Sequence, residues 1–524
     1  FNGGGHAHHF PRALLAFWGS TSATNSNSAY IKAADHFNTK ETDEHIRQVA
    51  CGLYTTFFLN NDGQVYSCGY NANGELGQGN VDTTENWDVG YTTQPHKSFA
   101  SVLMTGGKKA GNTDNIFVKK IICGDRHTLL LTYSDELWGF GKNTDGCLGR
   151  DPSTDPYKAS PIKISAEGEK VYAVSAGSNA SAYITYQGKV KVAGSNVNGK
   201  LGIDRYIEAP VPSIRATTET ITSFTESPNL TGVIEIQLGL QFTLGLMTDG
   251  QVIALGDNQY GSLGTRGGLS TVNDSHLSYQ RHEDVDAGVN SNNLLNFGRD
   301  INFKNLDKTL ICMPNTTMIW EKEEADQSVK AAGRSHAYQG GFYSSVATAV
   351  AAQSSITQVD QTFEGTVTKS SAKITKIVAA HSDTVKMLND KGEVWSYGLG
   401  DRYQHGNGSA SNIAIPVQPI HNDATLENIV NVAGGYYHTL ALDDDNRLWG
   451  WGVGNLAGAL VKSFNNVDTG NGGGHVNTSN HGSRYQESPY NTHDARTNSH
   501  GFNGGGHAHT TSPVLLNDGS GRVI

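Results

Sequence analysis

Charged side chains are scarce in this sequence. Asp, Glu, Lys and Arg make up 17% of its 524 residues, against about 25% in an average soluble domain. The formal net charge is -11, and binding to a phosphate backbone requires a basic face that this composition does not supply. We therefore expect no nucleic-acid partner. No apolar run approaches the ~20 residues of a membrane helix, so we expect no membrane insertion.

Cysteine is also rare. The five cysteines are an odd number and contain no Cys-x-x-Cys spacing, which excludes a disulfide framework and a zinc cluster of the common type. We expect them to be small buried apolar residues: Cys51, Cys68, Cys123, Cys147 and Cys312.

A repeated pattern occupies much of the chain. Six segments begin with alternating apolar residues, and they start near Ile46, Val118, Val171, Val233, Ile374 and Ile429. In five of them two glycines lie 17 positions apart, as Gly52 and Gly69 do. The sixth has Ala380 in place of the first glycine and one extra residue before Gly398, which we interpret as a lengthened hairpin at Asn389–Gly392.

Each repeat predicts four short strands. In the first repeat these include Val49–Cys51, Thr56–Leu59 and Gln64–Cys68, and the fourth strand is the least clear. Asn61-Asp62-Gly63 separates two alternating runs, which indicates a hairpin because Gly accepts positive φ. We expect the glycines at the strand ends to let neighbouring backbones approach near a crowded central channel.

A single sheet of this kind cannot bury both of its faces, so the sheets must stack around an axis, and closure removes exposed edges. Six copies leave a gap in such a ring. Joining Gly519–Ile524 to Phe1–Gly19 produces a seventh unit. We therefore predict an all-β chain in which residues 1–524 form a single seven-bladed β-propeller, closed by N- and C-terminal strands.

The glycines, together with Gly124–Thr128, Gly435–Thr439 and the terminal Leu76-Gly77, resemble the regulator-of-chromosome-condensation repeat family. The resemblance implies a propeller fold. It does not imply one function, because the family includes a nucleotide-exchange factor, a plant ultraviolet photoreceptor, a bacterial β-lactamase inhibitor and ubiquitin-ligase domains. The Gly-Trp-Arg-His-Thr elements that the photoreceptor would require are absent.

Two long segments interrupt the repeats. Residues 265–373 form an insert between blades, with possible strands at Thr309–Cys312 and Thr316–Trp320, and we expect it to fold on the rim. Residues 461–511 form a second insert, rich in Gly, Asn and His and poor in apolar residues. Segments of this length inside a compact fold favour binding loops, and the alternative is disordered decoration.

One octapeptide occurs twice, at Phe1–His8 and Phe502–His509. A His-x-His in an extended strand places both imidazoles on one side, which suits a transition-metal ion, and these elements resemble those of phage long-tail-fibre tips. The candidate metal ligands are His6, His8, His507 and His509. In the alternative interpretation His6 is a structural histidine of the repeat, like His127 and His438. No other cofactor is indicated.

No catalytic constellation stands out, so we expect a protein that is not an enzyme. The low charge and the richness in Asn, Gly and Thr favour a binding or adhesion module of a large assembly, with a virion or extracellular location preferred over a cytoplasmic one. Its partners would be protein subunits of that assembly or a surface receptor. The alternative is an intracellular regulator, such as a small-GTPase exchange factor or a scaffold.

Overall fold

The computed structural model describes the chain in separate ranges. They are residues 46–81, 96–104, 108–109, 116–203, 220–248, 250, 252–256, 308–314, 316–321, 329–334, 352–358, 372–379, 384–421, 424–453 and 509–515. Within these ranges the structure is built from strands, with one short 3-10 helix, η1 (Val197–Gly199). None of the described residues forms a helix long and apolar enough to cross a membrane.

The main sheets follow one another along the chain, and each is named here by its first strand. The β1 sheet contains β1 (Ile46–Cys51), β2 (Thr55–Asn60), β3 (Val65–Gly69) and β4 (His96–Ser101). The β7 sheet contains β7 (Val118–Cys123), β8 (His127–Thr132), β9 (Leu137–Lys142) and β10 (Tyr157–Lys163). The β11 sheet contains β11 (Val171–Ala176), β12 (Ala180–Thr185), β13 (Val190–Ser195) and β14 (Thr220–Glu226).

Four further main sheets complete the series. The β15 sheet has three strands, β15 (Val233–Leu238), β16 (Phe242–Met247) and β17 (Val252–Gly256). The β18 sheet contains β18 (Lys308–Cys312), β19 (Thr316–Glu321), β20 (Val329–Arg334) and β21 (Ala352–Gln358). The β22 sheet contains β22 (Ile374–Ala379), β23 (Thr384–Asn389), β24 (Val394–Gly398) and β25 (Ile413–Val417). The β28 sheet contains β28 (Ile429–Gly434), β29 (His438–Asp443), β30 (Leu448–Val453) and β31 (His509–Leu515).

Two minor hairpins accompany these sheets. They are β5 (Leu103–Met104) with β6 (Lys108–Lys109), and β26 (Ile420–His421) with β27 (Ala424–Thr425).

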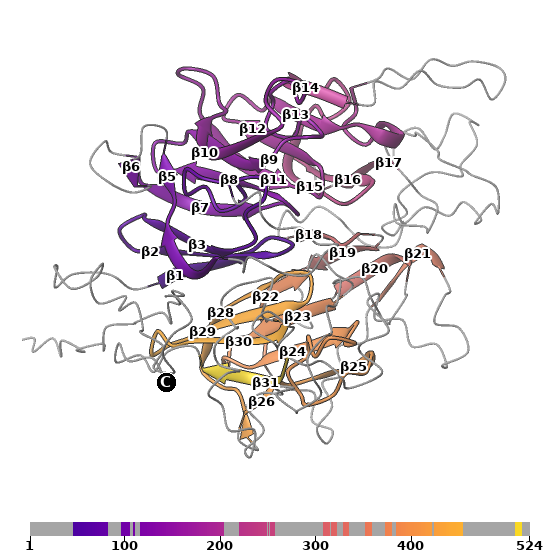
Figure 1. Ribbon diagram of the computed structural model, residues 1–524. Coiled ribbons are helices and arrows are strands. Elements are labelled where there is room, and N and C mark those ends of the chain that lie inside the picture. The colour runs from indigo at the N-terminus through magenta and orange to yellow at the C-terminus, as the bar shows by residue number, and fades with distance from the viewer. Residues whose placement is uncertain are drawn as a thin grey trace, which may run out of the picture.

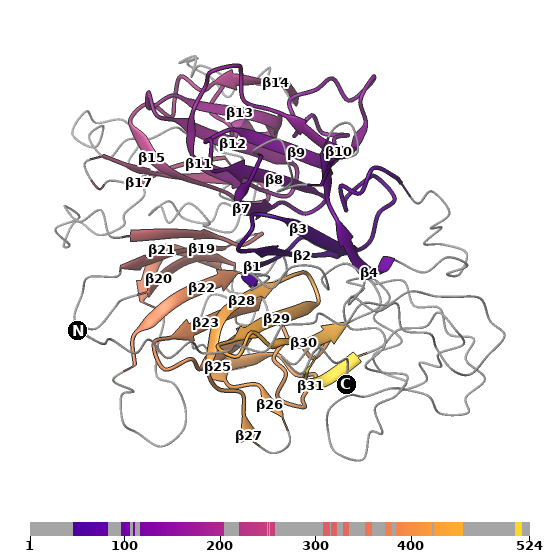
Figure 2. The same cartoon turned by 90° about the vertical axis from the view of Figure 1, so that its left-hand side faces the viewer.

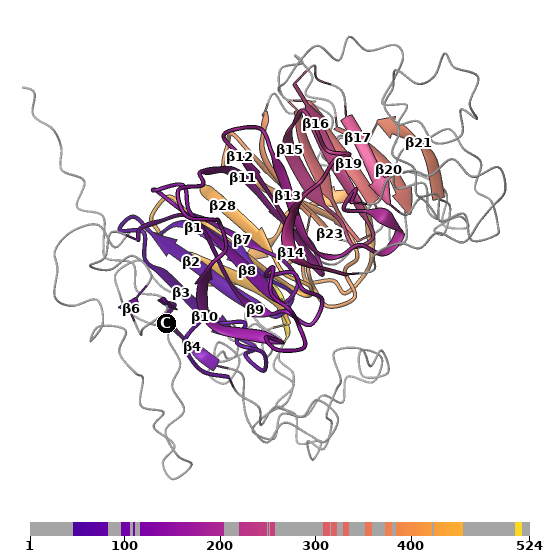
Figure 3. The ribbon, with the colours of Figure 1, turned by 90° about the horizontal axis from the view of Figure 1, so that it is seen from above.

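The first strands of the main sheets form a closed cycle of contacts. β1 contacts β7, and the contacts continue through β11, β15, β18, β22 and β28 back to β1. The indigo β1 and the orange β28 therefore lie side by side, although they come from opposite ends of the described chain (Figure 1). The β18 sheet lies between the β15 and β22 sheets (Figure 2), and Figure 3 shows the stack of sheets from above. The chain is an all-β propeller.

The number of complete blades differs from the prediction. Six sheets have four strands each, and the β15 sheet has three among the described residues, so the prediction of seven complete blades is wrong for this part of the chain. The ring closes through contacts between β1 and β28, and β31 pairs with β30 as the fourth strand of the β28 sheet. The unit expected from Gly519–Ile524 and Phe1–Gly19 lies outside the described residues.

Both predicted inserts contain strands of the ring. The strands predicted at Thr309–Cys312 and Thr316–Trp320 are confirmed as β18 and β19, but they belong to a blade in the ring instead of folding on the rim. Residues 265–373 are therefore not wholly an insert between blades. The segment 461–511 overlaps β31 at its end and interrupts the β28 sheet between its third and fourth strands.

The repeat glycines bring the sheets together at the centre. A Cβ built on Gly124 would lie 2.5 Å from the carbonyl oxygen of Gly177, and one on Gly177 would lie 3.0 Å from that of Gly239. The second glycine of each pair has a different role: Gly141 has φ of +100° and approaches the turn before β8. The predicted close approach of backbones at the channel is confirmed.

The hairpin between β23 and β24 is not lengthened. Residues 390–393 separate these two strands, and residues 61–64 separate β2 from β3, so the two hairpins have equal length. The prediction placed at Asn389–Gly392 is wrong, and the extra residue lies between β22 and β23, outside the described residues.

The second strand of most sheets is completely buried because it packs against neighbouring sheets on both faces. Every residue of β2, β8, β12, β16, β23 and β29 is buried. The predicted packing role of the third-strand tryptophans is confirmed for Trp395, Trp449 and Trp451, which are at most 8% exposed. Trp138 is half-buried against the core, and Trp18 lies outside the described residues.

Side chains link the inner strands of neighbouring sheets. The hydrogen-bonded ladders run within each sheet, so the free edge of an inner strand needs other partners. The Gln48 amide donates from Nε2 to the carbonyl of Ile121 (2.8 Å) and accepts from the N–H of the same residue (3.0 Å). Asn431 donates to the carbonyl of Arg47 across the closure of the ring, at 3.3 Å.

We expect Gln48→Glu to lower the free energy of unfolding by about 1–3 kcal/mol, because a carboxylate oxygen would replace the donor that faces the Ile121 carbonyl. Chemical denaturation at pH 7 measures the change. Gln64→Glu is the matched control, since Gln64 is half-buried and its Oε1 accepts from the Tyr66 hydroxyl (2.7 Å), as a carboxylate also would. Equal losses in the two variants would contradict the inter-sheet role.

The β22 sheet has a polar chain inside its core. Lys386 donates to Ser396 Oγ (3.1 Å), Ser396 lies 2.6 Å from His405 Nδ1, and His405 Nε2 lies 3.2 Å from the Gly398 carbonyl. Since Nε2 must donate to that carbonyl, Nδ1 accepts the serine proton. Lys386, Ser396 and His405 are 0% exposed.

Two of these three positions, those of Lys386 and His405, are apolar in the β1 sheet. Phe57 pairs with Ser67 in the register in which Lys386 pairs with Ser396. Leu76 precedes the terminal Gly77 as His405 precedes Gly406. Burial, and secondarily the Lys386 charge, lowers the pKa of His405 to about 3, and burial holds the pKa of Lys386 well below its usual range.

We expect His405→Leu to reduce the acid sensitivity of the fold. As the pH falls from 6.5 towards 3, the unfolded chain binds a proton at His405 that the folded chain does not, so the folded state loses stability. The stability of the variant relative to the unsubstituted protein should therefore rise by up to about 1.4 kcal/mol per pH unit in this window. Denaturation curves at pH 7, 6, 5 and 4 measure this difference, and parallel pH profiles would contradict it.

Candidate functional site

An arc of tyrosines capped by arginines runs along one edge of the propeller. Its residues lie in the turns between the first and second strands of the β1, β7 and β28 sheets, and just after β3 and β24. These turns adjoin one another in space because the ring closes between the β28 and β1 sheets. The tyrosine–arginine arc consists of Arg402, Tyr437, Tyr436, Tyr54, Tyr70 and Arg126.

Ring contacts join the β22 and β28 sheets at one end of the arc. The guanidinium of Arg402 lies 5.6 Å from the Tyr437 ring centroid. The rings of Tyr437 and Tyr436 are 4.1 Å apart in a tilted arrangement. Burial, with the neighbouring Tyr436 as a smaller cause, raises the pKa of Tyr437, so its hydroxyl stays protonated at neutral pH.

The arc continues across the closure into the β1 and β7 sheets. Tyr436 meets Tyr54 edge to face at 6.1 Å, and Tyr54 meets Tyr70 in the same way at 6.3 Å. The guanidinium of Arg126 lies 5.0 Å from the Tyr70 ring centroid. A backbone hydrogen bond from the Tyr436 N–H to the Leu53 carbonyl (3.2 Å) fixes the two turns together.

The arc combines fully buried residues with partly accessible ones. Tyr54, Tyr70 and Arg402 are at most 4% exposed, whereas Tyr436, Tyr437 and Arg126 are half-buried. Rigid aromatic side chains and arginine are the residue types that dominate protein–protein binding energy. This arrangement offers a preorganised contact surface.

Arg126 has a guanidinium that no described carboxylate neutralises. It stacks on Tyr70 and forms no ion pair within the described part of the chain. Glu75 lies close enough to be affected by it, but burial raises the pKa of Glu75, and its carboxylate accepts from Asn73. Arg126 is therefore available to an acidic group of a partner.

The sequence did not identify the arc. The turns Gly124–Thr128 and Gly435–Thr439 were noted only as marks of the repeat, and their middle residues are Arg126, Tyr436 and Tyr437. The sequence nevertheless contains a signal for these residues. They follow the first repeat glycine, in the turn that faces one edge of the ring. Their contact with Tyr70 and Arg402 depends on which sheets are neighbours.

The predicted metal ligands are mostly outside the described residues. His6, His8 and His507 lie there, and His509 is the first residue of β31. Within the described ranges, no group of three or more His, Cys, Asp or Glu side chains could hold a metal ion. The metal site at the His-x-His elements therefore stays a prediction.

The repeat histidines connect neighbouring sheets. His127 Nε2 lies 2.9 Å from Ser181 Oγ, between the β7 and β11 sheets. His438 Nε2 lies 3.3 Å from Thr56 Oγ1, across the closure of the ring. Both histidines are buried, so their role is structural.

The cysteines are thiols without disulfides. Cys51, Cys68 and Cys147 are buried as predicted, and Cys123 and Cys312 are half-buried. Cys51, Cys123 and Cys312 line a central cavity of about 300 Å³, to which the inner strand of every main sheet contributes.

Two models of known protein families match the repeats. One model, described as the regulator of chromosome condensation (RCC1) repeat, matches residues 46–75, 118–147 and 429–456. A second model with the same description matches residues 62–131, 134–184 and 391–442. The chain carries RCC1 repeats. The matched segments begin or end within the β1, β7, β11, β22 and β28 sheets.

Curated relatives share only part of their length with this RCC1-repeat chain. The ultraviolet-B receptor UVR8 of Arabidopsis thaliana is 29% identical over 172 residues, which are 33% of this chain and 34% of the relative. The X-linked retinitis pigmentosa GTPase regulator of Canis lupus familiaris is 32% identical over 142 residues, 27% of this chain and 13% of the relative.

A solved structure supports the fold. Prp20p from Saccharomyces cerevisiae is similar with a TM-score of 0.52 and 20% identity, over 76% of this chain and 82% of that one. Prp20p has binding properties to Gsp1p and histones. At this identity the likeness establishes the RCC1-type propeller fold alone.

We expect Tyr54 and Tyr436 to be energetically coupled across the closure of the ring. Edge-to-face aromatic pairs contribute about 0.5–1.5 kcal/mol beyond burial. A double-mutant cycle with Tyr54→Leu and Tyr436→Leu, measured by denaturation, should give a coupling of that size. The cycle of Tyr54→Leu with Tyr186→Leu is the control, since Tyr186 follows β12 at the opposite edge. Equal coupling in both cycles would contradict the contact.

Proposed function

We propose that this chain is a non-catalytic protein-binding module and that the tyrosine–arginine arc is its contact surface. The observation that carries the proposal is the continuous contact from Arg402 to Arg126 across four neighbouring sheets. A preorganised aromatic surface reduces the entropy that association costs. The structurally similar Prp20p, which binds Gsp1p and histones, supports this type of function.

The structure gives a matched pair of surfaces for a test. Tyr437 lies in the arc, whereas Tyr186 is 60% exposed at the opposite edge of the sheets. A photoreactive amino acid is placed at either position of the full chain, in the cells that produce it. We expect a discrete protein cross-link from position 437 and none from position 186. Absence of a cross-link at 437, or the same product at both positions, contradicts the proposal.

The partner identified in this way permits a quantitative test with purified proteins. Tyr437→Ala and Arg126→Ala should each weaken binding at least tenfold, which corresponds to about 1.4 kcal/mol. Tyr186→Ala should leave the affinity unchanged. Calorimetry measures the dissociation constants, and a loss of affinity confined to Tyr186→Ala would place the contact on the other edge.

Two biological roles are candidates for this protein-binding module. The low charge and the richness in Asn, Gly and Thr favour a subunit of a large assembly, such as a virion or extracellular structure that binds its neighbours or a receptor. Similarity to a GTPase regulator and to Prp20p favours an intracellular regulator of a small GTPase equally well.

A nucleotide-exchange assay separates these roles. A small GTPase loaded with a fluorescent GDP analogue is mixed with the full chain and excess GTP. Acceleration of nucleotide release that is lost in Tyr437→Ala would support the regulator, and release at the intrinsic rate would count against it.

A further inference from the structure

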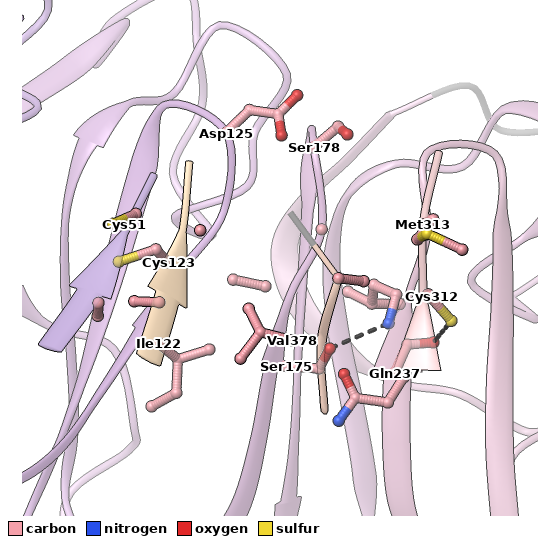
Figure 4. A pocket seen from close by; sticks show the side chains of 18 of the residues that line it. Cys51, Ile122, Cys123, Asp125, Ser175, Ser178, Gln237, Cys312, Met313 and Val378 are labelled. Atoms are coloured by element: carbon pink, nitrogen blue, oxygen red, sulfur yellow. Dashed lines mark hydrogen bonds between the residues drawn. The ribbon is translucent and has the colours of Figure 1, made fainter. Parts of the chain in front are cut away.

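The cavity at the centre of the ring has a volume of about 300 Å³. Figure 4 shows Cys51, Cys123, Ser175, Val378 and Cys312 around it, each from a different inner strand. Small apolar residues of the inner strands contribute to its wall, but polar groups make up the larger share of the exposed surface. Its volume is at the lower end of the range of small-molecule sites, about 300–1,000 Å³.

Two lysines place positive charge on this wall. Lys120 belongs to β7 and Lys376 belongs to β22, and both line the cavity. Asp125 is the one carboxylate among the described lining residues, and it lies in the turn after β7, beyond the end of that strand. Neither lysine forms an ion pair with a described carboxylate.

The Lys376 amine is held in place without being neutralised. It donates to Asn431 Oδ1 (2.7 Å) and to the Val432 carbonyl (2.8 Å), both of which are uncharged acceptors. An ammonium group has three donors, so one N–H is left for another acceptor. Burial lowers the pKa of Lys376 to about 8, Lys120 lowers it further, and Cys51 opposes the shift.

The cysteine thiols of the cavity do not supply a negative charge that would balance the two lysines. Burial raises the pKa of Cys51 well above its usual value and raises that of Cys123 to about 12. Both are neutral at physiological pH. The cavity therefore contains lysine charge that its own described groups do not balance. Lys376 is half-buried and Lys120 is exposed, so the partly desolvated charge of Lys376 is the one that an anionic partner would stabilise most.

We propose that the central cavity binds a small organic anion of the carboxylate class, with Lys376 and Lys120 as its cationic ligands. The carboxylate accepts the third N–H of Lys376, and the ligand's carbon skeleton packs on the small apolar residues of the inner strands. This site is separate from the tyrosine–arginine arc, so failure of one proposal leaves the other standing.

Proton linkage gives the site a signature that a structural role would not produce. A bound anion favours the charged form of Lys376, so the affinity should fall as the pH rises through about 8. Affinity for succinate measured by calorimetry on the full chain at pH 7 and at pH 9.5 should decrease at least tenfold between these values.

Substitutions test the two ligands. Lys376→Met and Lys120→Met should each weaken succinate binding at pH 7 at least tenfold. Lys386→Met is the matched control because it removes a buried lysine of the β22 sheet that does not line the cavity, and it should leave the affinity unchanged. Circular dichroism and the melting temperature of each variant show that it is folded.

Two probes distinguish which chemical class of anion the cavity binds. Succinate and inorganic phosphate are titrated separately. Succinate binding that depends on Lys376 supports the proposal. Binding of phosphate alone overturns the carboxylate assignment, and binding of neither ion, or succinate binding unaltered by Lys376→Met, overturns the site.

Discussion

The propeller depends on how the inner strands of neighbouring sheets are held together without a shared ladder. Each inner strand has one edge paired within its sheet, and its other polar groups need partners because a buried N–H or carbonyl without one is costly. Gln48 meets this need by bonding both backbone groups of Ile121. Asn431 and Lys376 act similarly between later sheets. The ring closes because these links and the glycine contacts recur around its axis.

The same ring creates both surfaces on which function is proposed. Closure between the β28 and β1 sheets brings Tyr436 against Tyr54, residues from opposite ends of the described chain, and thereby makes the arc continuous. Closure also forms the cavity, since each inner strand contributes only a few residues to it. The lysine charge in that cavity is a property of the assembled ring and of no single repeat.

Departures from the repeat have physical consequences. Where the β1 sheet buries Phe57 and Leu76, the β22 sheet buries Lys386 and His405. The two side chains are hydrogen-bonded through Ser396. Burial lowers the pKa of His405 to about 3, so a fall in pH destabilises this sheet. The repeat thus conserves backbone register, while the interior chemistry of individual blades varies within it.

Local pattern determined the strands, the hairpins and the glycine positions, because alternation of apolar residues and the need for positive φ at Gly63 or Gly141 act within a few residues. It also anticipated β18 and β19, although not their place in the ring. The tertiary structure alone decided the number of complete blades, the position of β31 in the last sheet, and the meeting of Arg402, Tyr437, Tyr54 and Arg126. These features depend on which sheets become neighbours, and a one-dimensional pattern does not contain contacts between residues hundreds of positions apart.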